Sequence, residues 1–184
     1  MRRVVITGFG IVSPIGTGAE AFFAGLAQGR DGIAPISRFD ASRLEVRYAG
    51  EVKEAFRFSS PREQDLAARD PKVGFALLAA EEALAMAGVS AFASTDLILI
   101  GASLETFFFK QFSLDPAEDT EDAFTRRLLA TPWRLPLDAA LTLIRDRYGC
   151  PGQAAINCSA CAVGLQTIGQ AFHAVRDGRF SLAL

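Results

Sequence analysis

The sequence predicts an α/β fold with a largely parallel sheet flanked by helices, because short apolar runs alternate with longer stretches of helical spacing. Two of the runs, 4–7 and 97–100, are β-branched or aliphatic throughout, as in strands covered on both faces. The predicted strands are 4–7, 97–100, 154–157 and 180–184. The predicted helices are 19–28, 71–87, 136–148 and 161–176, with a further helix ending near residue 130.

The composition is that of a folded globular chain. Half of the 184 residues are hydrophobic, 22% are charged, and the formal net charge is −2. With a pI near 5.5 and no basic cluster, nothing in the sequence indicates nucleic-acid binding. Three cysteines are a poor disulfide framework and favour a reducing compartment. No apolar run reaches the ~18 residues of a membrane span, so we expect a cytoplasmic protein.

At the N-terminus, Arg2-Arg3 before an apolar run superficially resembles a signal peptide, but glycines and a proline interrupt the run. The run reads better as a buried strand that enters a tight loop at Gly8-Phe9-Gly10. A dinucleotide-binding fingerprint would need a third glycine where Ser13 stands, so we expect a turn that takes the backbone off the sheet. Residues 30–68 read as irregular, with weak strand signals around 45–52.

The helix at 71–87 has clear end signals, with Asp70 as N-cap and Gly88 as the C-terminal stop. Between two predicted elements lie three adjacent phenylalanines, Phe107–Phe109, and an acidic stretch. They indicate either ordinary core beside a solvated turn or burial against another subunit or an acyl pocket. Because the sequence stops inside the apolar strand 180–184, we expect the chain to be one part of a larger fold.

The segment 155–176 combines a short strand, a polar turn with two cysteines and an amphipathic helix. A cysteine at a helix N-terminus lies where backbone N–H groups and the helix dipole favour a thiolate. Cys158 and Cys161 therefore have four interpretations: a nucleophile at position 161, a C-x-x-C redox pair, a metal site completed by other residues, or buried structural thiols.

His173, the single histidine, lies twelve residues after Cys161 on the same predicted helix. At ~1.5 Å per residue this is roughly 18 Å along the axis, too far to act as the base for that thiol or to share a metal with it. We therefore expect His173 to be a helix-surface residue, and any catalytic base to come from elsewhere.

The chain resembles the β-ketoacyl-[acyl-carrier-protein] synthases, condensing enzymes of the thiolase-like fold. RRVVITGFGIVSPIG, at 2–16, resembles the family's first strand and loop. Tyr148-Gly149, Gly152, Ser159–Ala162 and Gly164 resemble its nucleophile motif, and IGQAFHAVRDGRFSLAL resembles the helix and strand that follow. The resemblance covers the whole chain and implies the N-terminal half of a duplicated fold.

The resemblance implies that Cys161 accepts an acyl group from acyl carrier protein as a thioester. A malonyl-carrier thioester is then decarboxylated, and its carbanion attacks the acyl-cysteine in a Claisen condensation. The backbone N–H of Cys161 would contribute to an oxyanion hole, and neither metal nor organic cofactor is implied. The family takes two histidines and a lysine from a second half, so we expect these 184 residues alone to be unable to complete the reaction.

Three departures from the family pattern leave the acyl chain length and the pathway open. Val163 replaces a small residue beside the nucleophile, Cys158 creates a C-x-x-C that the family does not need, and Gly101-Ala102-Ser103 replaces a glycine-rich loop. Leu104 after that loop, Phe107 and Val163 are the predicted substrate-binding residues. Family members are dimers, so a homodimer or heterodimer is expected, with Phe107–Phe109 as interface candidates. The alternative is a non-catalytic half-domain or chain-length-factor-like partner subunit.

Overall fold

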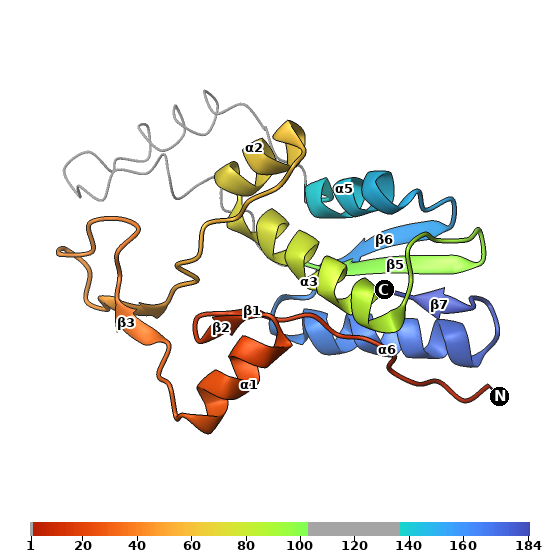
Figure 1. The fold of residues 1–184 in the computed structure, drawn as a ribbon, viewed down its shortest axis with the longest axis horizontal. Helices are drawn as coiled ribbons and strands as arrows, with labels where there is room; N and C mark the ends of the chain where they lie inside the picture. The colour runs from red at the N-terminus through yellow and green to blue at the C-terminus, as the bar shows by residue number, and fades with distance from the viewer. Residues whose placement is uncertain (1, 103–136) are drawn as a thin grey trace.

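Three parallel strands form the main sheet of the computed structural model, which describes residues 2–102 and 137–184 (Figure 1). Their order is β6-β5-β7, so the strand that comes first in the sequence lies in the middle. The strands are β5 at Asp96–Gly101, β6 at Gln153–Asn157 and β7 at Leu182–Ala183. The parallel α/β prediction and three of the four predicted strands are thereby confirmed, the last in shortened form.

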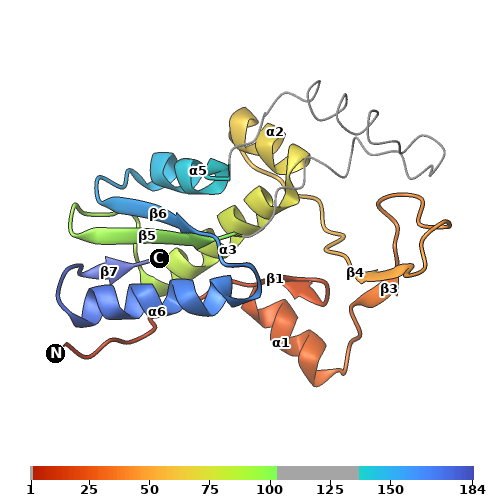
Figure 2. The ribbon, with the colours of Figure 1, turned by 180° about the vertical axis from the view of Figure 1, so that it is seen from behind.

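Helices cover both faces of this sheet. On one side lie α3, Pro71–Ala87, and α5, Ala139–Tyr148, which pack against each other; on the other side lies α6, Val163–Arg176 (Figures 1 and 2). The hydrophobic core lies on the α3/α5 side, where Ile98 of β5 is fully buried. Alternate residues of a strand face opposite sides, so Gly101 and Asn157, at the paired ends of β5 and β6, face α6.

The predicted strand at 4–7 is wrong. Residues 2–10 form neither helix nor strand in the described part of the chain, and Val5 and Ile6 are exposed. Gly8-Phe9-Gly10 is not a turn either, and its backbone lies against α3. A side chain at Gly8 or Gly10 would collide with the carbonyl oxygens of Ala83 and Ala79. These two glycines therefore serve close backbone approach to a helix rather than a change of direction.

A short antiparallel hairpin follows this segment, formed by β1, Val12–Ser13, and β2, Gly16–Thr17. The carboxylate of Glu82 on α3 accepts hydrogen bonds from the backbone N–H groups of Ile11, at 2.9 Å, and Ala19, at 2.6 Å. Glu82 thereby fixes both ends of the hairpin to α3. The next element, α1 at Ala19–Ala27, confirms the predicted helix at 19–28.

Residues 30–68 are more ordered than predicted. They contain a second hairpin, β3 at Ile33–Pro35 paired with β4 at Tyr48–Gly50, and a helix, α2, at Pro61–Arg69. The strand signal at 45–52 is confirmed in part by β4, whereas α2 was not predicted. Its signal was present in the sequence, because Ser60 followed by Pro61 and Glu63 is a capping pattern, and the Ser60 hydroxyl accepts from the Glu63 N–H at 3.4 Å.

The other helix predictions are confirmed with small shifts. Asp70 caps α3 by accepting from the Lys72 N–H, and Gly88 ends it in a left-handed conformation. α6 begins two residues later than predicted, after η1, a 3₁₀ turn at Ala160–Ala162. Phe107–Phe109, the acidic stretch and the helix near residue 130 lie outside the described residues. Among the described helices, none is long and apolar enough to cross a membrane.

Candidate active site at the start of helix α6

The two exposed cysteines lie where β6 passes into α6. After Asn157 the chain turns through Cys158 and Ser159, and Ala160 adopts a φ of 46°, the one left-handed non-glycine residue in the described part of the chain. The Ala162 N–H then donates to the Ser159 carbonyl at 3.1 Å and closes η1. A left-handed alanine costs roughly 1–2 kcal/mol, so this turn stores strain directly before Cys161.

The structure separates the three cysteines by environment. Cys150 is buried, 6% exposed, and belongs to the hydrophobic core, whereas Cys158 and Cys161 are exposed. None of the three forms a disulfide within the described residues. The interpretation as buried structural thiols therefore fits Cys150 but is wrong for Cys158 and Cys161.

His173 lies in the last turn of α6, whereas Cys161 precedes the first turn. Its ring is exposed and contacts that of Phe172, with centroids 5.4 Å apart. The prediction of a surface histidine remote from Cys161 is confirmed. The metal-site interpretation finds no support in residues 2–102 and 137–184, where no three histidine, cysteine or carboxylate side chains are placed to hold an ion.

Asn157 and Thr167, which flank the cysteine turn in the sequence, form a hydrogen-bonded pair. The Asn157 amide donates to the Thr167 hydroxyl at 3.1 Å, and that hydroxyl donates to the Val163 carbonyl at 2.7 Å. Neither Asn157 nor Thr167 was singled out from the sequence. The available signal was weak: a polar residue that ends a strand, and a threonine four residues after the first residue of a helix.

Val163 is half-buried and packs on the end of β5. A Cβ placed on Gly101 would lie 3.0 Å from the Val163 Cγ2 and 2.9 Å from the Thr167 hydroxyl, so only glycine fits between this strand end and α6 without displacement. Leu104 and Phe107, the other predicted substrate-binding residues, lie outside the described residues. The roles of all three stay predictions.

All 184 residues match the family model described as the β-ketoacyl synthase N-terminal domain. The chain belongs to the β-ketoacyl synthase family. A 3-oxoacyl-[acyl-carrier-protein] synthase 2 from Synechocystis sp. is 30% identical over 185 residues, which cover 96% of this chain and 43% of that protein. The family predicted from the sequence motifs is thus confirmed, and the chain spans less than half the length of this relative.

Solved structures show the same fold. The ishigamide ketosynthase/chain length factor is 26% identical, with a TM-score of 0.73 over 97% of this chain and 45% of that chain. A type II polyketide ketosynthase in complex with its acyl carrier protein is 22% identical, with a TM-score of 0.64 over 97% of this chain and 43% of that chain. The thiolase-like α/β fold predicted for this family member is therefore confirmed.

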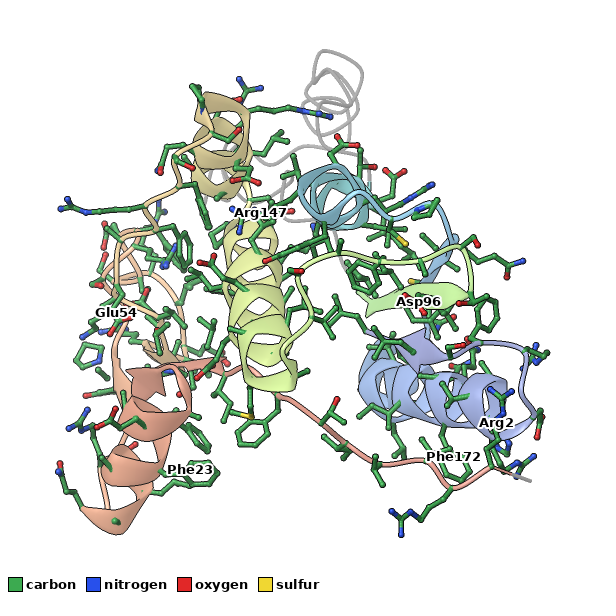
Figure 3. All side chains as sticks on the ribbon, turned by 45° about the vertical axis from the view of Figure 1, so that its right-hand side comes forward. Arg2, Phe23, Glu54, Asp96, Arg147 and Phe172 are labelled. Carbon is green, nitrogen blue, oxygen red and sulfur yellow. The ribbon has the colours of Figure 1, made fainter. Side chains whose placement is uncertain are left out.

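In this chain the outer face of α6 is apolar and exposed. Leu165, Ile168 and Phe172, which follow helical spacing, are 80%, 65% and 44% exposed. The stripe runs from the cysteine turn toward the end of the helix, where Phe172 lies near the extended N-terminal segment and Arg2 (Figure 3). There the Arg2 N–H donates to the Arg176 carbonyl at 3.1 Å.

One polar group of the turn has no partner. The Ser159 hydroxyl oxygen is buried and makes no hydrogen bond within the described residues. Buried hydroxyls normally have a partner, so this oxygen is an exception in the described part of the chain.

Proposed function

We propose that the protein is an acyltransferase that carries out decarboxylative Claisen condensation in fatty acid or polyketide biosynthesis, with Cys161 as the nucleophile. The observation that carries the proposal is the placement of this exposed thiol in a strained turn between a parallel strand and the start of α6. Membership of the β-ketoacyl synthase family supports the same reaction.

In the first step the Cys161 sulfur attacks the carbonyl carbon of an acyl thioester. A new carbon–sulfur bond forms, the carrier thiolate leaves and takes up a proton, and the acyl group remains on the enzyme. The negative charge that develops on the carbonyl oxygen is stabilised by backbone N–H donors, and the Cys161 N–H is the donor we assign to it. The helix N-terminus adds a favourable electrostatic field.

In the second step a malonyl thioester loses carbon dioxide, and the electron pair left on carbon attacks the acyl-cysteine carbonyl. The carbon–sulfur bond to Cys161 breaks, and the product, two carbons longer, leaves on its carrier. This step needs the two histidines and the lysine that the family takes from its second half. His173 does not replace them, because it lies at the far end of α6. We therefore expect the isolated chain to carry out acyl transfer but not condensation.

Two features support the proposal that condensation needs a second half: the exposed α6 stripe next to the cysteine turn, and the Ser159 hydroxyl within that turn, which has no hydrogen-bond partner among the described residues. The synthase from Synechocystis extends well beyond the part matched here. We propose that this further half covers the stripe and brings the missing groups to Cys161. No metal or organic cofactor is needed in the scheme.

Acyl carrier protein is the proposed donor of both thioesters, as the ketosynthase solved with its carrier suggests. Val163 is proposed to narrow the acyl site beside the nucleophile, with Leu104 and Phe107 as the other pocket residues. The working assembly is proposed to be a homodimer or heterodimer. A cytoplasmic location is proposed from the odd cysteine number.

Mass spectrometry of peptides after treatment with a short acyl thioester tests the first step. We expect selective acylation of Cys161 over Cys158 and Cys150, loss of label in Cys161→Ala, and retention of label in the matched control Cys158→Ala. Equal labelling of the exposed cysteines, or none, would contradict the proposal. Condensation of acyl and malonyl carrier thioesters by the isolated chain would contradict the expectation that a second half is required.

The rival function is a non-catalytic partner subunit, and the similarity to a ketosynthase/chain length factor structure keeps it in view. Such a subunit would pair with a catalytic chain and leave Cys161 unacylated. A redox function predicts instead a reversible Cys158–Cys161 disulfide at physiological potential, which thiol titration in glutathione buffers detects.

A further inference from the structure

The side chains of Asn157 and Thr167, one on each side of the cysteine turn in the sequence, are hydrogen-bonded to each other. The two side chains lie ten residues apart in the sequence, and Cys161 lies between them. A threonine hydroxyl carries one hydrogen, and here it is donated to the Val163 carbonyl. The hydroxyl oxygen is thus left to accept from the Asn157 amide, so the donor and acceptor roles of both bonds are consistent.

Each end of this pair is fixed by the sheet. Asn157 is the last residue of β6, where it pairs with Gly101, and its carbonyl accepts from the Ala102 N–H at 3.0 Å. Thr167 lies in the second turn of α6, and a Cβ placed on Gly101 would lie 2.9 Å from its hydroxyl oxygen, so little space separates this side chain from the end of β5. Through its bond to the Val163 carbonyl, the pair joins a strand end held on the sheet to the first turn of α6.

We propose that Asn157 and Thr167 are positioning residues that orient the Cys161 backbone for acyl transfer. The inference rests on the proposed function. The strained φ of Ala160 favours relaxation of the turn, and the Asn157–Thr167 bond opposes that relaxation by holding both flanks. A donor to the developing oxyanion works only when it is held close to its productive geometry.

Acyl transfer and alkylation separate a positioning role from a purely structural one. Acylation passes through a tetrahedral oxyanion, so it depends on the orientation of backbone donors near Cys161. Alkylation by iodoacetamide attacks a saturated carbon and forms no oxyanion, so it depends only on access to the thiol. Loss of the Asn157–Thr167 hydrogen bond should therefore slow acylation of Cys161 and leave its alkylation unchanged.

The test compares Thr167→Val, which keeps the shape and removes the hydroxyl, with Thr167→Ser, which keeps the hydroxyl. Thr142→Val, the same change on α5 across the sheet, is the matched control. We expect Thr167→Val to slow acylation of Cys161 by a short acyl thioester about threefold to tenfold, the value of the Asn157–Thr167 hydrogen bond that holds the turn. Iodoacetamide alkylation should not change, Thr167→Ser should restore acylation, and Thr142→Val should resemble the wild type.

Asn157→Leu should show the same split, and the double variant with Thr167→Val should be no slower than Thr167→Val alone, because the Asn157–Thr167 bond is already absent in that single variant. Equal loss of acylation and alkylation in Thr167→Val, failure of Thr167→Ser to rescue, or an unchanged acylation rate would each overturn the inference. A wild-type chain that accepts no acyl group would overturn the proposed function and this inference with it.

Discussion

Helices α3 and α6 carry apolar side chains at the same helical spacing but use them differently. In α3 the stripe Val73, Leu77, Ala80 and Leu84 is buried in the core. In α6 the stripe of Leu165, Ile168 and Phe172 faces outward, and Leu165 is 80% exposed. Periodicity therefore predicts a helix and its apolar face, but it does not identify the surface that covers the face.

The helix starts differ in the same sense. α3 begins at Asp70, a buried side chain that caps its first turn, whereas α6 follows Ala162 and has no side-chain cap. At the start of α6 the Val163 N–H donates to the Ala160 carbonyl instead. The apolar face of α3 packs into the core, whereas the outer face of α6 is exposed in the described part of the chain.

The largest expected effect is on stability. Leu77→Ala should lower the free energy of unfolding by about 2–5 kcal/mol, because it removes a side chain that is 1% exposed in the core. Leu165→Ala, the same substitution on α6, should change it by less than about 0.5 kcal/mol. Urea denaturation followed by circular dichroism measures both, and similar losses in the two variants would end the distinction between the helices.

The α3 side is also held by charge. Arg147 of α5 forms a bidentate ion pair with Glu63, at 2.5 Å and 2.9 Å, and a further pair with Glu81 of α3 at 2.9 Å. The hydrogen bond to Glu63 raises the pKa of Arg147, so this guanidinium stays charged across the accessible pH range. Glu63 is 6% exposed and depends on this cation.

Arg147→Ala should therefore cost about 3 kcal/mol of unfolding free energy, because it leaves the Glu63 carboxylate buried without its cation. The matched control is Arg62→Ala, which breaks the exposed pair with Asp146 and should cost less than about 1 kcal/mol. Thermal unfolding measures both. Equal melting temperatures of the two variants would show that the buried Arg147–Glu63 pair stabilises the fold no more than the exposed pair does.

The helices of the core could be predicted from the sequence, because Asp70, Gly88 and Gly149 mark helix ends by local chemistry alone. It failed at 4–7, where an apolar β-branched run indicates burial but not a strand partner. The helix at Pro61–Arg69 was missed although its capping pattern was present. The polar composition of residues 30–68 indicates irregular structure, whereas the capping residues Ser60 and Pro61 specifically indicate a helix start.

For the site, the sequence motif singled out Cys161, and its spacing from His173 excluded a wrong partner. The bond between Asn157 and Thr167 was beyond sequence reasoning, because it depends on how β6 and α6 are placed in three dimensions. The left-handed backbone at Ala160 could not be predicted either, since alanine rarely adopts that conformation and a glycine or asparagine, the usual signal for it, is absent at this position.

Two left-handed positions give the third prediction, of about 1 kcal/mol. Gly88 ends α3 with a φ of 68° and has open space around it, so Gly88→Ala should destabilise by about 1 kcal/mol through backbone strain alone. Ala160→Gly is the reverse change and should raise stability by up to about 1 kcal/mol without slowing acylation of Cys161, because glycine adopts this φ without strain. Chemical denaturation and the acylation rate measure the pair; slower acylation in Ala160→Gly would show that the strain itself serves the site.

The smallest effect is at the C-terminal end of α6, where Asp177 is followed by Gly178, a left-handed glycine with a φ of 75°. A hydrogen bond from Arg176, at 2.8 Å, lowers the pKa of Asp177, with smaller contributions from His173 and Arg179. Because the folded-state pKa is depressed, this group contributes stability above its unfolded pKa and loses it as the pH falls through the folded value. Arg176→Met should raise the pKa of Asp177 in an NMR titration, whereas Arg179→Met should move it less. Equal shifts would mean that general positive charge, and not the Arg176 hydrogen bond, sets the pKa; either way α6 should lose little stability, since an exposed pair is worth little.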